Sequence, residues 1–202
     1  MPLRVNGDAG QAFPIYITVV GGLLLLAFAY FAVGQAAVTR SEAQTAADAA
    51  ALAAALETRD QLADQWLENV LEPDSWQDIF DGEVPVPDGC WRAQELAARN
   101  DASADCEQDG LLGYTVVAET NEAVGDTIVP GTEDQKAMES ATAVIEARCT
   151  FELPAEDAGE DVLPALSCKG EEWGLSPDDL NDLPKAEDLF DVHLADGQAN
   201  DE

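Results

Sequence analysis

The side chains that could do chemistry are four cysteines, one histidine and a large excess of carboxylates. His193 lies in the alternating segment Asp191-Val192-His193-Leu194, a pattern typical of an exposed strand position. A catalytic triad also needs a nucleophile and a group that orients the imidazole, and neither accompanies His193. Carboxylates stand in adjacent pairs such as Asp178-Asp179, whereas acid–base catalysis needs two carboxyl groups in different environments. The sequence therefore predicts no catalytic residue and no enzyme activity.

One acidic segment, Asp105-Cys106-Glu107-Gln108-Asp109-Gly110, is similar to the first half of an EF-hand calcium loop. The twelfth position of such a loop would be Val116, where calcium binding needs a bidentate Glu. We expect a polar turn closed by a disulfide here. The sequence therefore predicts no metal site and no cofactor.

The four cysteines fall into two close pairs, with no C-x-x-C spacing and no histidine partner for a metal site. Two disulfides in an exported domain fit this pattern best. Three connectivities are possible, and the spacing favours Cys90–Cys106 and Cys149–Cys168.

The charge balance excludes a whole class of functions. Among 202 residues, 41 are Asp or Glu and 9 are Lys or Arg, which gives a formal net charge of -32. Nucleic-acid binding needs clustered basic side chains to neutralise phosphates, so we predict no nucleic-acid partner. Apolar residues make up 47% of the chain, enough for the core of one modest domain with appendages.

The apolar residues concentrate near the amino terminus, where the 31 residues between Asp8 and Arg40 carry no charge. As a helix this run would be roughly 46 Å long, and a bilayer core needs only about 20 residues. We predict a transmembrane helix over residues 13–38. The alternatives are a buried core helix and a secretory signal cleaved near Ala32-Val33-Gly34.

The helical pattern continues beyond this span. Residues 43–56 are rich in alanine and leucine, and Gly or Pro is absent until Pro73, so we predict one helix over residues 13–71. Its second part, residues 39–72, forms an Ala-rich continuation in water. A stripe at helical spacing predicts its packing face: Leu52, Leu56, Arg59, Leu62, Trp66 and Val70.

The numbers of Lys and Arg on the two sides of the span differ too little to indicate its orientation. The distribution of cysteines therefore sets the predicted orientation. Residues 1–12 would be a short cytoplasmic leader, and all four cysteines would lie outside the cytoplasm. The exported domain would occupy residues 73–195, followed by a disordered acidic tail over residues 196–202.

Short alternating segments predict the exported domain. We expect a helix over residues 90–99 capped by Asp88, a strand over residues 112–119 and a longer strand over residues 142–153. Residues 162–168 would return antiparallel to the longer strand, and residues 190–194 would form a closing strand. A long helix followed by a small disulfide-bridged antiparallel sheet belongs to the α+β class.

Two segments carry a family resemblance. Gly10-Gln11-Ala12-Phe13-Pro14-Ile15, an apolar span and then the run from Ala43 to Ala53 resemble the amino-terminal segment of TadG/TadE-like proteins of tight-adherence (Flp, type IVb) pilus assembly systems. The resemblance covers about residues 8–57. It implies a pilin-like fold and a single-pass membrane protein that works beside a secretion ATPase and an inner-membrane platform.

The resemblance also implies a processing site. Gly10 would be the residue before cleavage and Gln11 the new amino terminus. The fifth mature position would then be Ile15. Proteins that resemble substrates of prepilin peptidases carry Glu at that position, so this chain departs from the pattern there. Larger TadG-like proteins carry a von Willebrand A-like domain, and Asp101-Ala102-Ser103-Ala104-Asp105, in an expected polar loop, lacks the second Ser of its metal motif.

These expectations define a structural or assembly component of a pilus or related secretion system, of minor-pilin or pseudopilin type. Its partners would be membrane lipid and other pilin-like or Tad pilus assembly proteins, with no small-molecule substrate. The alternative is a membrane-tethered extracytoplasmic binding module unrelated to a filament. The predicted packing surface toward a partner helix consists of small side chains: Ala46, Ala47, Ala50, Ala51 and Ala54.

Overall fold

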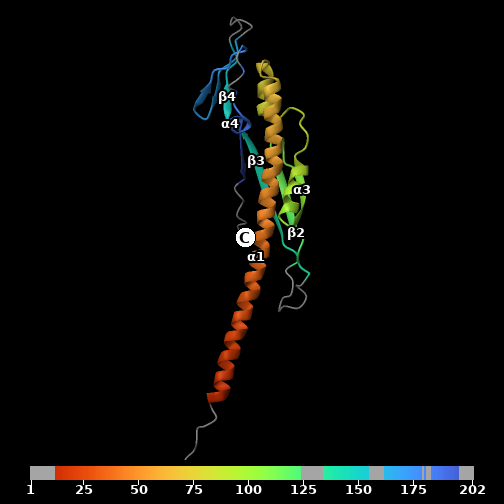
Figure 1. Cartoon of the computed structure of the whole chain (residues 1–202), viewed down its shortest axis with the longest axis vertical. Coiled ribbons are helices and arrows are strands. Elements are labelled where there is room, and N and C mark those ends of the chain that lie inside the picture. The colour runs from red at the N-terminus through yellow and green to blue at the C-terminus, as the bar shows by residue number, and fades with distance from the viewer. Residues whose placement is uncertain (1–11, 124–133, 155–161, 179, 181–182, 196–202) are drawn as a thin grey trace, which may run out of the picture.

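A single helix, α1 (Ala12–Glu68), organises the molecule. This computed structural model describes residues 12–123, 134–154, 162–178, 180 and 183–195. Pro14 lies in the first turn of α1, where a missing backbone N–H costs nothing, and no further proline occurs before Pro73. The predicted helix over residues 13–71 is thus confirmed to within a turn. Figure 1 shows α1 as a rod whose amino-terminal part projects away from the rest of the molecule.

Three short helical elements follow α1. They are a 3₁₀ turn, η1 (Pro73–Ser75), then α2 (Trp76–Phe80) and α3 (Cys90–Arg99). The bounds of α3 are those predicted from the sequence. The cap residue of α3 is Gly89 and not Asp88 as predicted. The Asp88 Oδ1 still accepts a hydrogen bond of 2.8 Å from the N–H of Cys90, the first residue of the helix.

The larger sheet in the described part of the chain has four antiparallel strands in the order β1-β2-β3-β7. They are β1 (Ala102–Gln108), β2 (Gly113–Thr120), β3 (Met138–Ala147) and β7 (Phe190–Leu194). Strands β2, β3 and β7 lie against α1, while α3 packs on both α1 and β1. The strands sit on either side of the rod in Figure 1.

A smaller antiparallel sheet lies near the carboxyl end of α1. Within the described residues it has the order β4-β5-β6: β4 (Cys149–Phe151), β5 (Leu166–Cys168) and β6 (Glu171–Trp173). A short helix, α4 (Ala186–Leu189), leads directly into β7. The predicted α+β class is confirmed, with a long apolar helix followed by antiparallel sheets. We call the described residues from 73 to 195 the head.

Two predictions about strands are corrected. Within residues 101–110, expected to be a polar loop and turn, residues 102–108 instead form β1. It pairs with β2 so that Cys106 lies opposite Val116. Its inward positions are small and only partly apolar, so the alternation is weak in the sequence.

The single strand expected over residues 142–153 divides at Arg148 into β3 and β4, which belong to different sheets. The Arg148 N–H donates to the Leu189 carbonyl at 2.8 Å, and its own carbonyl accepts from the Lys169 N–H at 3.2 Å. The chain thereby leaves its partner β7 and takes β5 as its new partner.

Candidate functional site: an uncovered apolar helix and its anchored continuation

The amino-terminal part of α1 has no cover within the described structure. We call residues 14–38 the uncovered segment. Apart from half-buried Val20, its large apolar side chains are more than half exposed, and Tyr30 reaches 83%. They are Ile15, Tyr16, Ile17, Val19, Leu23, Leu24, Leu25, Leu26, Phe28, Tyr30, Phe31, Val33 and Val38. A contiguous apolar surface of this size marks a site of interaction with a membrane or a protein.

The threonine hydroxyls in and just after the uncovered segment form hydrogen bonds within the helix. The Thr18 hydroxyl donates to the Pro14 carbonyl at 2.7 Å, and the Thr39 hydroxyl donates to the Gln35 carbonyl at 3.2 Å. This i to i−4 bonding removes the need for a water partner. The segment therefore has the length, the composition and the internal hydrogen bonding of a membrane span.

Contacts between α1 and the head begin where charged residues resume after the apolar run. Arg40, the first charged residue after the apolar run, forms an ion pair with Glu139 on β3. One turn later the Gln44 amide reaches the Ser140 carbonyl at 3.5 Å. The boundary of the uncovered segment is thus also the lower edge of the sheet.

The next part of α1, residues 43–68, is the covered segment, and small side chains line its buried face. Ala43, Ala46, Ala47, Ala50, Ala51, Ala54 and Ala55 are all fully buried. Alanine allows the backbone of α1 to approach the sheet and α3 closely. Burial at this interface therefore comes from close backbone approach rather than from large side chains.

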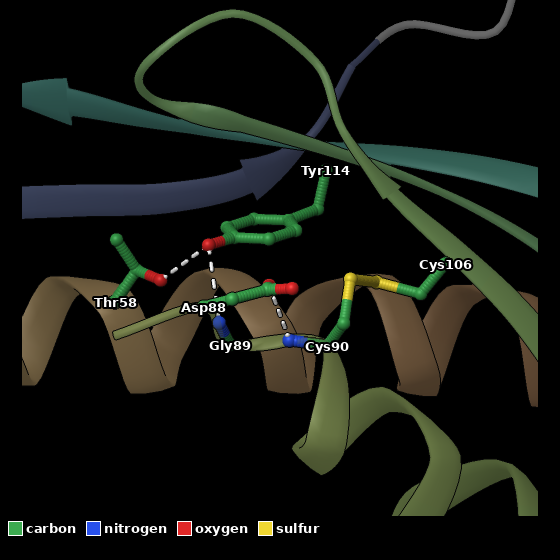
Figure 2. Close-up of a disulfide and its surroundings, with 6 residues drawn as sticks. All are labelled: Thr58, Asp88, Gly89, Cys90, Cys106 and Tyr114. Carbon is green, nitrogen blue, oxygen red and sulfur yellow. Dashed lines mark hydrogen bonds between the residues drawn. A yellow bond between two sulfur atoms is a disulfide. The ribbon is translucent and has the colours of Figure 1, made fainter. Parts of the chain in front are cut away.

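A hydrogen-bonded group fixes the start of α3 on α1. The Tyr114 hydroxyl lies 2.7 Å from Thr58 Oγ1 and accepts a hydrogen bond of 3.2 Å from the Gly89 N–H, as Figure 2 shows. A Cβ at Gly89 would lie 2.3 Å from the Ala54 carbonyl oxygen, so only glycine fits there. Three elements (α1, β2 and the residue before α3) meet at this point.

The first disulfide lies beside this group, as Figure 2 shows. Cys90 at the start of α3 is bonded to Cys106 on β1, with a Cα–Cα distance of 5.6 Å. The second disulfide joins Cys149 on β4 to Cys168 on β5, which are directly paired in the register of the smaller sheet. Both predicted connectivities are confirmed.

An aromatic cluster anchors the far end of α1. Trp66 contacts Trp76 with ring centroids 5.4 Å apart, and Trp76 meets Phe151 of β4 edge-on at 5.2 Å. Phe80 continues the cluster to Phe151 and to Phe190 of β7. Aromatic pairs in such geometry stabilise beyond their buried area by about 0.5–1.5 kcal/mol. The cluster joins α1, α2 and both sheets.

The structure corrects the expectation for the predicted packing surface. Ala46, Ala47, Ala50, Ala51 and Ala54 face this chain's own sheet and α3 and are fully buried, so no partner helix can reach them in this fold. The larger side chains on this part of α1 lie on its other faces. The alanine face is buried because its small side chains let the sheet and α3 approach the helix most closely.

The predicted leucine stripe is only partly correct. Leu62, Trp66 and Val70 are buried, whereas Leu56 is exposed and Leu52 and Arg59 are half-buried. The alanine face, not the leucine face, is turned inward over the first half of the covered segment. The leucine positions were therefore a poor guide to the buried face of this part of α1, because the closeness of backbone approach determines which face is buried.

The remaining predicted positions are placed as follows. Gly10 and Gln11 lie outside the described residues. His193 lies exposed on β7, as expected, with its Nδ1 3.7 Å from Asp191 Oδ2. Asp105 lies on β1. In the part of the chain that the structure describes, no group of three or more His, Cys, Asp or Glu side chains is placed to hold a metal ion.

Sequence reasoning missed the group formed by Thr58, Gly89 and Tyr114. Its members lie far apart in the chain, and none belongs to a motif. Gly89 next to Cys90 was the one local signal, because a glycine beside a bridged helix start often marks a close backbone approach. The contact with Ala54 is a property of the tertiary structure alone.

Together, these features define a class: a long helix with an uncovered apolar half and a covered half anchored in a small, disulfide-bridged α+β head. Residues 10–57 match the family model described as Tad, putative Flp pilus-assembly TadE/G-like. The match spans the whole uncovered segment and the first part of the covered segment, and it confirms the resemblance. This similarity supports a role in pilus assembly. The comparisons with curated proteins and with solved structures gave no match.

Proposed function

We propose that this protein is a membrane-anchored structural or assembly component of a Tad-type (type IVb) pilus or a related secretion system, of minor-pilin or pseudopilin type. The observation that carries this proposal is the coincidence of two ranges. The family match over residues 10–57 contains the whole segment of α1 that the head leaves uncovered. The similarity to pilus-assembly proteins therefore covers the part of α1 that the head leaves accessible.

The predicted span, residues 13–38, supports membrane anchoring by its length. As a helix it extends about 39 Å, against about 30 Å for the hydrocarbon core of a bilayer. The most apolar stretch of α1 has no residue buried by the rest of the described chain. A lipid environment would cover these side chains, which water would leave exposed at a large cost in free energy.

Both disulfides support an extracytoplasmic head. Disulfides persist in oxidising compartments and are reduced in the cytosol. With Cys90–Cys106 and Cys149–Cys168 joined, the head belongs outside, and residues 1–12 would then face the cytoplasm. The ion pair of Arg40 with Glu139 would hold the lower edge of the sheet at the membrane surface.

In this proposal the functional surface is a helix that binds partners, and not a catalytic cleft. Partners would be other pilin-like or Tad pilus assembly proteins that contact α1, together with membrane lipid. The acidic head keeps neighbouring structures apart by repulsion and maintains solubility. We assign it no substrate and no enzymatic role.

The test replaces two leucines of the span in the native bacterium. Leu24→Lys with Leu26→Lys places two charges in the bilayer core, each costing about 2.5–3.5 kcal/mol. We expect loss of the protein from the membrane fraction and loss of surface pili in electron micrographs, as in a deletion strain.

The matched control is Leu67→Lys with Leu71→Lys, at two exposed leucines at the carboxyl end of α1 and just after it. These changes should leave both membrane localisation and pili intact. Normal pili in the deletion strain would overturn the pilus role. Alkylation of free thiols in the native protein before reduction would overturn the orientation.

A further inference from the structure

A hollow of about 660 Å3 lies where the uncovered segment of α1 meets the residues that follow β2. We call it the junction hollow. Its volume is within the range of ligand pockets, about 300–1,000 Å3. Its α1 positions recur every three or four residues, so they share one face of the helix. The lining residues are Ala27, Tyr30, Phe31, Gly34, Gln35, Val38, Thr39 and Glu42 on α1, and Glu122 and Ala123 after β2.

The lining of the junction hollow changes in character along α1. Its lower part, residues 27–34, is apolar apart from one phenol hydroxyl. The neutral polar side chains of Gln35 and Thr39 come next, with Val38 between them, and Glu42 ends the series. The acyl chain, the phosphate and the headgroup of a phospholipid follow one another in the same order. The hollow therefore has the polarity profile of one lipid molecule lying along the helix.

The length of the predicted span indicates the depth of the hollow in the membrane. Residues 13–38 extend about 39 Å, which is about 9 Å more than the hydrocarbon core requires. We assign this excess to the headgroup layer on the side of the head, because the polar lining begins at Gln35. Residues 13–32 then cross the hydrocarbon, and residues 33–42 lie at the level of the headgroups. Tyr30 is close to this boundary, where aromatic side chains are enriched in membrane proteins.

A buried threonine holds the residues after β2 beside α1. The Thr120 side chain is 5% exposed, and its hydroxyl donates to the Glu122 carbonyl at 2.9 Å and accepts from the Ala137 N–H at 3.1 Å. The next N–H, that of Asn121, donates to the Asp101 carbonyl at 2.8 Å. The backbone of Glu122 is therefore fixed to the sheet, and this residue lines the hollow opposite the helix.

The two carboxylates of the hollow, those of Glu42 and Glu122, favour a positively charged group. Neither takes part in an ion pair within the described residues, and the neighbouring Arg40 is paired with Glu139. The described lining contains no Lys or Arg. These carboxylates repel an anionic headgroup such as phosphatidylglycerol and can accept charge-assisted hydrogen bonds from a primary ammonium. A choline headgroup has no N–H to donate.

We propose that the junction hollow binds one molecule of phosphatidylethanolamine from the leaflet on the side of the head. Its ammonium group contacts Glu42 and Glu122, and one acyl chain lies along residues 27–34. The Gln35 amide supplies N–H donors for the phosphate. This inference rests on the membrane anchoring in the proposed function and adds a lipid of stated chemistry and the residues that recognise it.

A lysine side chain of a protein partner could also bring an ammonium group to the two carboxylates. The lower part of the hollow favours the lipid. Its residues 27–34 belong to the uncovered segment, which has the length and hydropathy of a membrane span. One lipid molecule satisfies both the apolar and the acidic part of the hollow, whereas a lysine would occupy the acidic part alone.

The experiment measures which lipids the full-length protein retains. The protein is reconstituted in vesicles that contain equal amounts of phosphatidylethanolamine, phosphatidylglycerol and phosphatidylcholine with identical acyl chains. It is then extracted in mild detergent, and native mass spectrometry counts the bound lipids. We expect one phosphatidylethanolamine per chain, retained about fivefold to tenfold more often than either other lipid, as two exposed ionic contacts would give. Equal retention, or a preference for phosphatidylglycerol, would overturn the site.

Two pairs of variants test the charge and the location. Glu42→Gln with Glu122→Gln keeps the shape of the hollow and should abolish the preference for phosphatidylethanolamine. The control, Glu68→Gln with Glu72→Gln, changes two exposed carboxylates at the other end of α1 and should keep it. A preference that persists without Glu42 and Glu122 would contradict the assignment.

The second pair fills the hollow without changing charge. Gly34→Leu adds a side chain where the structure has open space, so it should exclude the lipid and leave the head folded. Gly21→Leu adds the same side chain at an equally open position of the uncovered segment outside the hollow and should bind lipid as the parent does. Parental lipid binding by the Gly34→Leu protein would show that the lipid lies elsewhere.

The outcomes separate this inference from the proposed function. A deletion strain that lacks pili, together with a protein that shows no lipid preference, would leave the pilus role standing and refute the lipid site. Normal pili in the deletion strain would refute the pilus role, while lipid retention by the purified protein would still support the site. Loss of pili from Glu42→Gln with Glu122→Gln, without any lipid preference in the parent, would assign the carboxylates to a basic protein partner instead.

Discussion

Side-chain size is a poor guide to burial along α1 until Leu62 and Trp66, which are fully buried near its carboxyl end. In the uncovered segment, leucines, isoleucines and aromatic residues are more than half exposed. In the covered segment, seven alanines are fully buried, while Leu56 and Leu67 are exposed. Size and hydrophobicity alone therefore do not determine what this helix buries. The covered half is adapted to a closely approaching backbone, whereas in the proposed function lipid covers the other half.

The covered half shows how small residues produce a firm anchor. Close approach brings many atoms of α1 within contact distance of the sheet and α3, and dispersion gains add over all of them. The same approach allows the Thr58 and Tyr114 hydroxyls to meet across the interface. The uncovered half has neither feature, so matched substitutions in the two halves should have opposite outcomes.

The largest contrast is expected from aromatic truncation. Trp66→Ala removes a fully buried ring of the aromatic cluster and should lower the free energy of unfolding by about 3–5 kcal/mol. Phe28→Ala, in the uncovered segment, should change it by less than about 0.5 kcal/mol. Urea unfolding of the full chain in detergent, followed by far-UV circular dichroism of the head, measures both. Equal losses would contradict the distinction between the halves.

Glycine substitutions sharpen the same comparison. Gly89→Ala places a Cβ 2.3 Å from the Ala54 carbonyl oxygen and should cost about 2–3 kcal/mol by forcing α3 away from α1. Gly34→Ala meets open space in the uncovered segment and should leave the unfolding midpoint of the head unchanged. Thermal unfolding of both variants in detergent checks this. A Gly89→Ala protein as stable as the parent would show that the close contact is not required.

Removal of one hydroxyl tests the polar contact alone. Tyr114→Phe leaves the buried Thr58 hydroxyl and the Gly89 N–H without their partner, at an expected cost of about 1–2 kcal/mol. Tyr30→Phe, at a side chain 83% exposed, serves as the control and should stay within about 0.5 kcal/mol of the parent. A double variant with Thr58→Val should recover part of the loss, because the orphaned hydroxyl is then absent.

The smallest effect is expected at the junction of the two halves. Arg40→Gln removes the ion pair with Glu139, and the arginine side chain of that pair is largely exposed to solvent. Exposed pairs contribute about 0–1 kcal/mol, and salt screens them. The difference between variant and parent should therefore vanish at high salt. A larger loss that persists in high salt would assign Arg40 a packing role.

Local patterns were sufficient for several elements. The helix over residues 90–99 and both disulfides depend on residues close in the chain. The strand over residues 190–194 was recognised from its own alternation, although its partner β3 is distant in the chain. The extent of α1 followed from the absence of proline between Pro14 and Pro73.

Other features depended on partners distant in the chain. Strand β1 has a weak alternation and forms because β2 offers it a paired edge. Arg148 interrupts a continuous strand pattern because α4 and β5 supply its backbone partners. The inward face of α1 was predicted from its leucines, whereas the sheet selected its alanines.

The amino-acid sequence by itself determined that an uncharged apolar helix continues into an alanine-rich one and that four cysteines pair locally. These properties follow from composition and short-range spacing, which act before any fold exists. Only the tertiary structure decided which face of α1 is buried and that Gly89 meets Ala54. It also decided that a hollow remains between α1 and α3. Those outcomes depend on how near two backbones can come, a quantity that belongs to the packed elements together.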